Sequence, residues 1–425
     1  METTGRPRPR TFACRILIVG CGLSGVATAI AMRRTGHKVI GAGIQLSPNA
    51  TRLFQTWEIS EAISSYAYQP QEGTLRSYRG LVLSKQASGL AIEERYEAPY
   101  LVVHRADLLK VLVSEAQKLG VEIKLGSNVA SIDFFKPSIT LSTGETYEGD
   151  MILGADGERS ACREAMLGHS DLPESTGDLV FRIAVKTRGL SQQQDLSELL
   201  QHPSVNVWMG PDAHAVSYML KREDILNVVL VCPDNPGSQV LYGPQRANLD
   251  ELRKAFCSWD PMFGSLLDVQ DADCTKWSLL QISEVASWCH SSGKFALIGD
   301  AAHAMLPYLA QGAAQAFEDA GFLGTLFAMI EDPSQIADAL GVYERVRKPR
   351  VTEVRNRTNT QKLVYGLPDG PLQESRDKKL ASADPAEGCP NALADPVFQG
   401  WLWGYDAVLE AQQAWDTFMR VKRTV

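Results

Sequence analysis

The stretch "RILIVGCGLSGVATAIAMRRTGHKV", residues 15–39, decides the fold. Its apolar residues 16–19 predict a buried strand, and Gly20, Gly22 and Gly25 follow as a GxGxxG turn before a helix of small residues. In such a turn the first glycine permits the bend, the second lets the backbone approach a pyrophosphate, and the third lets the helix pack closely on the strand. Free N–H groups at the helix start favour anions. The stretch predicts a dinucleotide site in a Rossmann-like fold, and the alternative is an ordinary glycine-rich turn.

The segment after this turn lacks a group that such a site usually has. A carboxylate at the end of the second strand, about 20 residues on, normally bonds the hydroxyls of the adenosine ribose. There is no Asp or Glu between Gly25 and Glu58, and the expected position, near Ala42, lies in a Gly-Ala-Gly turn. The second strand, expected over 37–40, is also short. The ribose end of the predicted site is therefore incomplete.

Length and composition limit the class of protein. A chain of 425 residues is long enough for two domains, because single cores rarely exceed about 250 to 300 residues. The hydrophobic fraction of 44% and the charged fraction of 22% are typical of a soluble globular protein. A net charge of −8 argues against nucleic acid as a partner, because proteins that bind polyanions carry basic surfaces.

The eight cysteines are scattered, with no CxxC pair, so neither a zinc site nor a disulfide framework is expected. No apolar run approaches the roughly 18 residues needed to span a bilayer, so we expect no stable membrane insertion. The basic N-terminus lacks the context of a cleavage site and predicts a flexible arm, not a signal peptide. These features predict a cytoplasmic protein, either a monomer or a homodimer.

Changes in periodicity predict the domain organisation. Helical and short strand patterns fill residues 1–175, two-residue alternation marks 176–285, and the first pattern returns at 286–345. We predict an α/β fold with a discontinuous, Rossmann-like nucleotide-binding domain, 1–175 and 286–345, and a β-rich second domain, 176–285. A C-terminal helical region, 346–425, contains a Pro/Gly/Asp-rich interruption that is expected to be a surface loop, from about 366 to 396.

Local signals add four elements to this outline. Ser47 is a candidate N-cap with Pro48 at the first helical position. A second helix is expected to bury one face, a hairpin is expected to turn at Thr143-Gly144, and a buried strand is expected over 151–153. The face of the second helix consists of Leu108, Leu109, Leu112 and Val113.

Two further motifs follow the glycine turn. "GADGERSACR", residues 154–163, places Asp156 just after a buried strand, and "FALIGDAAHAMLPYLAQGAAQAFEDA", residues 295–320, places Asp300 at the end of another. Either carboxylate alone could be an ordinary strand-end residue. Because the two motifs occur in this order behind a GxGxxG turn, the chain resembles the single-component FAD-dependent aromatic hydroxylases, which are also called group A flavoprotein monooxygenases. The resemblance is strongest to the fungal salicylate hydroxylase-like enzymes. The resemblance extends over nearly the whole length and includes "HRADL", "WMGPDAHAVSYML", "FCSWDP", "YERVRKPR" and "WLWGYDA".

The resemblance implies that 1–175 and 286–345 form an FAD-binding domain and that 176–285 form a substrate domain, and it implies how FAD is held. Asp300 would bond the flavin's ribitol or ribose chain, and the backbone at Gly312 and Ala313 would face the pyrimidine end of the isoalloxazine. Arg105 would contact FAD, and Asp156 would contact both FAD and NAD(P)H. Arg105 could instead pair with a surface acid, and His303 is expected to be a hydrogen-bonding residue at a helix start, not a catalytic base. The complete predicted cofactor set is Gly20, Gly22, Gly25, Ala42, Gly43, Arg105, Asp156, Asp300, Gly312 and Ala313.

The resemblance also implies the reaction. NAD(P)H would reduce the flavin, O2 would add at its C4a carbon, and an electron-rich aromatic ring would attack the resulting hydroperoxide. Arg182 and Tyr218 match the arginine and tyrosine that related enzymes place at a phenolic substrate, and are the predicted catalytic residues. The alternative is an edge arginine and a core tyrosine. The expected small-molecule partners are an aromatic substrate and O2, plausibly in fungal secondary metabolism.

The short second strand keeps other functions open. Relative to the family, a strand-and-loop segment of roughly a dozen residues is missing where "HKV" runs into "IGAGIQ". A wrongly spliced gene model, a compensated deletion and a decayed enzyme would each leave this pattern. The alternative function is therefore a weakly active or inactive flavoprotein relative, and a third is an epoxidase or Baeyer–Villiger-type flavoenzyme.

Overall fold

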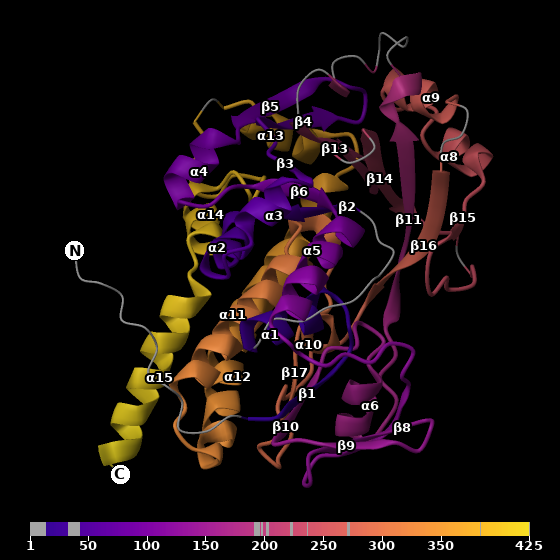
Figure 1. The fold of residues 1–425 in the computed structure, drawn as a ribbon. Coiled ribbons are helices and arrows are strands. Elements are labelled where there is room, and N and C mark those ends of the chain that lie inside the picture. The colour runs from indigo at the N-terminus through magenta and orange to yellow at the C-terminus, as the bar shows by residue number, and fades with distance from the viewer. Residues whose placement is uncertain are drawn as a thin grey trace.

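The computed structural model describes residues 14–32, 43–190, 196, 199–200, 204–221, 224–235, 237–269, 273–382 and 384–424. Most of the predicted N-terminal arm, the second strand expected over 37–40, and Ala42 lie outside these residues. Figure 1 shows an elongated molecule with a large sheet in its upper part and two long helices, α11 (Gly312–Met329) and α12 (Ile336–Tyr365), in its lower part.

Three strands from distant parts of the chain form a parallel sheet in the lower part of the molecule (Figure 1). They are β1 (Ile16–Val19), β10 (Met151–Gly154) and β17 (Phe295–Leu297), in the order β1-β10-β17. The strand predicted over 151–153 is confirmed as β10, and all its residues are buried. The strand predicted over 16–19 is confirmed as β1, but it is half-buried and not buried, because among the described strands it pairs with β10 alone.

The helix predicted after the glycine turn is α1 (Leu23–Met32), and it packs between α11 and α5 (Arg105–Lys118). The small side chains of α1 allow this close packing, and Val26, Ala27 and Ile30 belong to the core that the parallel sheet shares. The predicted apolar face of α5 is buried in the same core. Segments from 1–175 and from 286–345 therefore meet in one hydrophobic core.

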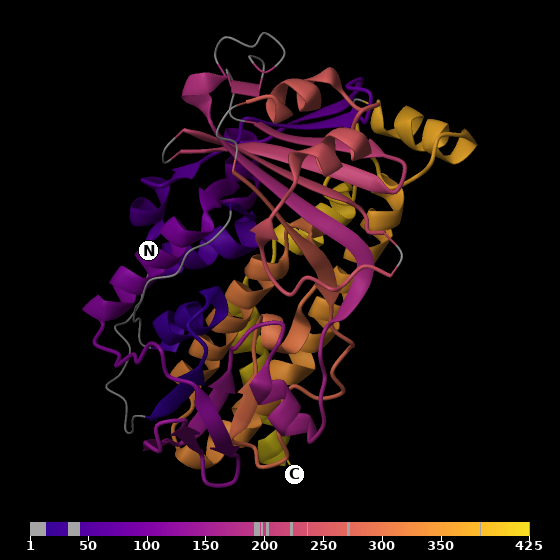
Figure 2. The same ribbon diagram turned by 90° about the vertical axis from the view of Figure 1, so that its right-hand side faces the viewer.

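An eight-stranded sheet forms the upper part, and Figure 2 shows its strands lying above the helices of the lower part. Its order is β15-β16-β11-β14-β13-β12-β4-β5, and every neighbouring pair is antiparallel except β12 and β4. The segment predicted to be β-rich supplies most of this sheet, whereas β4 and β5 come from residues 1–175; the domain boundaries remain a prediction. The strands are β4 (Glu72–Ser77), β5 (Val82–Ala87), β11 (Glu174–Lys186), β12 (Ser204–Gly210), β13 (Ala213–Leu220), β14 (Ile225–Pro233), β15 (Gln245–Arg246) and β16 (Asp273–Gln281).

The two faces of the large sheet contact different partners, as the two-residue alternation requires. On β14, Leu226, Val228 and Leu230 pack in an outer core with residues of α8 (Leu249–Ala255) and α9 (Pro261–Leu267). Val231 packs on the opposite, inner face, with residues of η2 (Pro307–Leu309) and of α12. The inner face therefore lies toward the segment that follows Asp300.

The other elements connect these two parts. A hairpin turns at the predicted Thr143-Gly144 position, and α2 (Pro48–Thr56) begins at Pro48 with Ser47 as its N-cap residue. The interruption from about 366 to 396 is not entirely loop, because α13 (Pro371–Leu380) begins at a proline and is held by buried Arg376. The remaining strands are β2 (Gly43–Leu46), β3 (Ala67–Tyr68), β6 (Leu101–His104), β7 (Val129–Asp133), β8 (Ser138–Leu141) and β9 (Thr146–Glu148). The remaining helices are α3 (Ser60–Ser64), α4 (Leu90–Tyr96), α6 (Ala161–Leu167), η1 (Thr187–Gly189), α10 (Asp300–His303), η3 (Pro333–Gln335), α14 (Pro396–Trp403) and α15 (Ala407–Thr424).

Candidate active site

The three glycines of the first turn differ in what surrounds them. Gly20 has φ +116°, and a Cβ there would lie 2.2 Å from the carbonyl oxygen of Ala155. A Cβ at Gly25 would lie 2.2 Å from the carbonyl oxygen of Gly20, whereas a Cβ at Gly22 would meet nothing within 4 Å. Gly20 and Gly25 are therefore required by the packing of the protein itself. Gly22 borders open space, which fits the close approach of a pyrophosphate.

Asp300 and the start of α11 form a second wall of the predicted cofactor site. Asp300 is half-buried, and no residue in the described ranges donates a hydrogen bond to its carboxylate. A Cβ at Gly312 would lie 4.0 Å from Asp300 Oδ1, so the carboxylate lies beside the helix start. The side chain of the N-cap residue Gln311 does not cap α11. The first amide groups of this helix therefore remain available to a ligand.

Asp156 and Arg105 lie in different settings. The Asp156 carboxylate accepts hydrogen bonds from Ser160 Oγ at 2.5 Å and from the Cys162 N–H at 3.0 Å, so it holds the start of α6. Arg105 is exposed at the start of α5, and β2 begins beside it because Gly43 pairs with His104.

Glu158 lies near both Arg105 and Asp300. Desolvation and the nearby Asp300 carboxylate raise the pKa of Glu158, whereas Arg159 and Arg105 lower it. Both Asp300 and Arg105 therefore lie within electrostatic range of one carboxylate. The structure brings these two predicted cofactor residues to the same region, and their contacts to FAD remain predictions.

The edge of β1 that pairs with no strand in the described part of the chain borders a wide groove. Segment 120–127 forms the other wall, and the groove contains about 1840 Å³ of empty space, part of it open to solvent. In a Rossmann sheet the second parallel strand lies along this edge of the first. The groove therefore lies where the second strand would be expected, and this strand is the part of the sequence that is shorter than expected. Ala42, the predicted residue at the ribose end, lies outside the described ranges.

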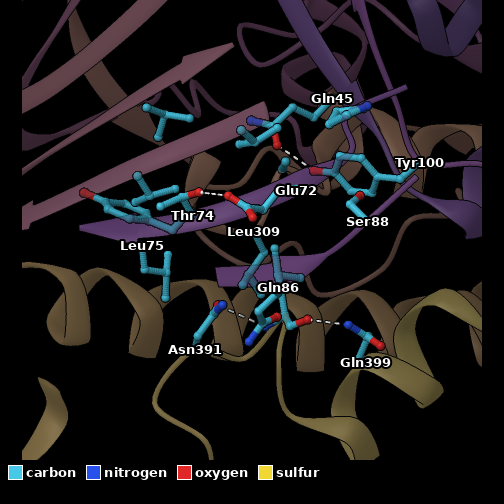
Figure 3. Close-up of a pocket in the computed structure, with 18 of the residues that line it drawn as sticks. Gln45, Glu72, Thr74, Leu75, Gln86, Ser88, Tyr100, Leu309, Asn391 and Gln399 are labelled. Carbon is cyan, nitrogen blue, oxygen red and sulfur yellow. Dashed lines mark hydrogen bonds between the residues drawn. The ribbon is translucent and has the colours of Figure 1, made fainter. Parts of the chain in front are cut away.

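A cavity lies between the inner face of the large sheet, η2 and the C-terminal segment 391–403 (Figure 3). We call it the sheet cavity. It contains about 880 Å³ of empty space, part of which is open to solvent. Tyr100 Oη donates to Gln45 Oε1 at 2.5 Å on one side, and Asn391 and Gln399 approach from the C-terminal segment (Figure 3).

Three aromatic side chains that line the sheet cavity form one cluster. The His214 ring lies 4.7 Å from the Tyr308 ring and 5.7 Å from the Tyr365 ring, between ring centroids. Burial, with a contribution from Lys362, lowers the pKa of His214 to about 3, so its imidazole is neutral at physiological pH. Burial also raises the pKa of Tyr308 and Tyr365, which keeps both phenols protonated. The cluster therefore offers uncharged hydrogen-bonding groups to a ligand.

Arg182 and Tyr218 are brought together on the inner face of the large sheet. Arg182 Nε donates to Asn227 Oδ1 at 2.8 Å, and Asn227 is the strand partner of Tyr218. Neither Arg182 nor Tyr218 belongs to the lining of the sheet cavity. Tyr100 does belong to it, and the pKa of Tyr100 is raised mainly by burial and also by the nearby Tyr218. Arg182 and Tyr218 lie beside the cavity wall, and their catalytic roles remain predictions.

Several cavity residues had no role in the sequence analysis. His214 lies four residues before Tyr218 on one strand, so both point to the same face, and this spacing could have identified it. Thr74 and Gln86 could not have been identified in this way, because they reach the cavity only through the pairing of β4 with β12 and of β5 with β4. His303 Nε2 donates to Asp319 Oδ2 at 2.6 Å and the side chain is fully buried, as expected for a structural histidine.

Comparisons with known proteins agree with this geometry. The family model of the FAD binding domain matches residues 13–358. The FAD-dependent monooxygenase OpS4 of Beauveria bassiana (strain ARSEF 2860) is 38% identical over 416 residues, 94% of this chain and 96% of that protein. The 3-amino-4-hydroxybenzoate 2-monooxygenase PtnB3 of Streptomyces platensis is 32% identical over 415 residues, covering 93% and 97%. A solved salicylate hydroxylase substrate complex has a TM-score of 0.77 and 25% identity, covering 94% of this chain and 98% of that one.

These matches define a flavin-dependent monooxygenase. The chain belongs to the FAD binding domain family, and it is an FAD-dependent monooxygenase of the aromatic hydroxylase type. The family resemblance and the α/β fold predicted from the sequence are confirmed. No helix in the described part of the chain is long and apolar enough to cross a membrane.

The second and third glycines of the turn should respond differently to alanine. Gly25→Ala should lower the free energy of unfolding of the FAD-free protein by about 1 to 3 kcal/mol, because its Cβ would meet a backbone oxygen at 2.2 Å. Gly22→Ala should leave that stability nearly unchanged and weaken FAD binding. Denaturant unfolding measures the stability of both variants, and a flavin titration measures their affinity for FAD. Normal FAD affinity in Gly22→Ala would contradict the placement of the pyrophosphate.

His214 should make stability depend on pH. Its folded pKa is lowered from 6.5 to about 3, so as pH falls below 6.5 the unfolded chain takes up a proton that the folded chain does not. Between about pH 7 and about pH 5 this should remove about 2 kcal/mol from the free energy of unfolding. Denaturant unfolding at both pH values should show a smaller loss in His214→Gln than in the wild type. Exposed His169→Gln, the control, should keep the wild-type dependence.

Proposed function

We propose that this FAD-dependent monooxygenase uses NAD(P)H and O2 to hydroxylate a small phenolic or other electron-rich aromatic substrate in the sheet cavity. The observation that carries the proposal is the position of this cavity. Pro307, Tyr308, Leu309 and Ala310 line it, and only Gln311 separates them in the sequence from Gly312 and Ala313, the predicted flavin contacts. A ring in the cavity would therefore lie next to the flavin's reacting edge.

The described residues fit FAD at its flavin and pyrophosphate parts. The open space at Gly22 suits the pyrophosphate, and the Asp300 carboxylate can accept hydrogen bonds from the flavin's hydroxyl chain. The uncapped start of α11 suits the negative charge of a reduced flavin. When bound and reduced by NAD(P)H, the flavin supplies the oxygen transfer, by the C4a-hydroperoxide route that the family resemblance implies.

The residues of the chain would bind and orient the substrate. A neutral His214 ring nitrogen can accept a hydrogen bond from a substrate hydroxyl, and the hydroxyls of Tyr308 and Tyr365 can donate. Arg182 and Tyr218 lie beside the cavity wall and not in its lining, so Arg182 would favour the phenolate form of the substrate from behind this wall, because a nearby positive charge stabilises an anion, and Tyr218 would help to hold the wall. The relatives named for 3-amino-4-hydroxybenzoate and salicylate support a substrate with one ring and a hydroxyl group.

The groove along β1 favours a second candidate, a weakly active or inactive flavoprotein relative. This candidate follows if no other group replaces the missing carboxylate at the adenosine ribose. The name of the first relative supports an active enzyme. We also propose a role in fungal secondary metabolism, a cytoplasmic location and a monomeric or homodimeric state. These parts of the proposal rest on the sequence alone.

Turnover of purified protein tests the proposed function. With added FAD, phenolic compounds should accelerate NAD(P)H oxidation and yield products that have gained one oxygen atom, measured by mass spectrometry. Arg182→Lys keeps the charge but loses the planar donor fork, so hydroxylation should fall by about tenfold or more while flavin content and thermal stability remain unchanged. NAD(P)H oxidation that no aromatic compound accelerates would reject the proposal. Loss of folding together with activity would return Arg182 to a structural role.

Restoring the short second strand tests the second candidate. A carboxylate at the ribose makes charge-assisted hydrogen bonds worth about 1.5 to 3 kcal/mol, or roughly tenfold to a hundredfold in affinity. A chain with a glutamate-containing strand-and-loop segment inserted between Val39 and Gly41 should therefore bind FAD more tightly than the present chain. The matched control carries the same insertion with glutamine. Flavin titrations that give equal affinities for all three proteins would mean that another group bonds the ribose.

A further inference from the structure

A closed ring of hydrogen bonds joins the starts of two helices. Ser47 Oγ donates to Asn49 Oδ1 at 2.6 Å, Asn49 Nδ2 donates to Gln311 Oε1 at 3.1 Å, and Gln311 Nε2 donates to Ser47 Oγ at 2.9 Å. Ser47 is the N-cap residue of α2 and Gln311 is that of α11. All three side chains are at most 2% exposed. We call this arrangement the cap ring.

The cap ring uses side chains that ordinarily cap helices. An N-cap side chain usually accepts a hydrogen bond from the first turn of its own helix. Neither Ser47 nor Gln311 makes such a bond, because each side chain is held by the other and by Asn49. The cap ring therefore fixes the two helix starts relative to each other and leaves the first amide groups of α11 unused.

Asn49 sets the direction of the bonds in the cap ring together with Gln315, whose Nε2 also donates to Gln311 Oε1 at 3.3 Å. Its Nδ2 also donates to Glu318 Oε1 at 2.6 Å, and an ionised carboxylate can only accept. Glu318 is fully buried and is bound by both Arg347 and Arg350, and these arginines hold its pKa below the usual range although burial alone would raise it. The oxygen and the nitrogen of the Asn49 amide therefore cannot exchange places, so its Oδ1 faces Ser47 and its Nδ2 faces Gln311.

We propose that Asn49 is a positioning residue for the flavin: through the cap ring it holds the start of α11 so that the Gly312 and Ala313 amide groups face the isoalloxazine. The inference rests on the proposed placement of the flavin beside these two residues. Asn49 itself acts through Gln311, and helix-start amides stabilise negative charge that develops on a ligand. Loss of the cap ring should therefore affect the reduced flavin more than the oxidised one.

Asn49→Leu tests this role, because leucine is of similar size and makes none of the three hydrogen bonds. We expect its Kd for FAD to rise by about tenfold and the flavin midpoint potential to become more negative. The matched control is Asn206→Leu. Asn206 is also a buried amide, 3% exposed, but it bonds Ser204 and Arg76 in the large sheet. The control should lose stability without a change in FAD affinity or potential.

The measurements are flavin titration, potentiometry and thermal unfolding of the three proteins, all without substrate. A shift in potential confined to the Asn49 variant supports the inference. An unchanged potential, or equal shifts in both variants, would overturn it, since a general loss of stability would then explain the result. If Asn49→Leu does not fold, Asn49→Ser is compared in the same way. Because no aromatic compound is present, a failure of the proposed hydroxylation would not affect the outcome.

Discussion

Two adjacent buried carboxylates on α11, Glu318 and Asp319, hold the site together. Arg347 binds both of them, and Arg350 binds Glu318 through two nitrogen atoms at 2.8 Å. Charges as deeply buried as these are tolerated only when they are paired, and removal of one partner from a buried pair typically costs about 3 to 5 kcal/mol. The packing of α11 against α12 therefore cannot change without exposing or unpairing a charge.

The two carboxylates also reach the two ends of the candidate flavin site. Asp319 Oδ2 accepts from the Gly299 N–H at 3.0 Å and from His303, so it fixes the turn that carries Asp300. Glu318 fixes Asn49 and, through it, Gln311. The predicted cofactor residues that follow β17 and that begin α11 thus share one buried electrostatic anchor.

Local patterns were sufficient to predict several elements of the fold. The glycine turn, β10 and the start of α2 each follow from a few neighbouring residues, and the structure has them where the sequence predicts them. The use of Ser47 could not be predicted, because its hydroxyl bonds Gln311, which is 264 residues away, in place of its own helix. The sheet cavity was missed for the same reason. Its wall requires the parallel pairing of β4 with β12, and two-residue alternation does not specify which strand pairs with which.

The sheet cavity is also assembled from segments that are made at very different times. Gln45 lies near the beginning of the chain, His214 lies in the middle, and Trp403 comes close to its end. Arg350 holds the last of these segments in place through the carbonyl groups of Trp401 and Leu402. During synthesis on a ribosome, the sheet cavity can therefore close only after nearly the whole chain has emerged.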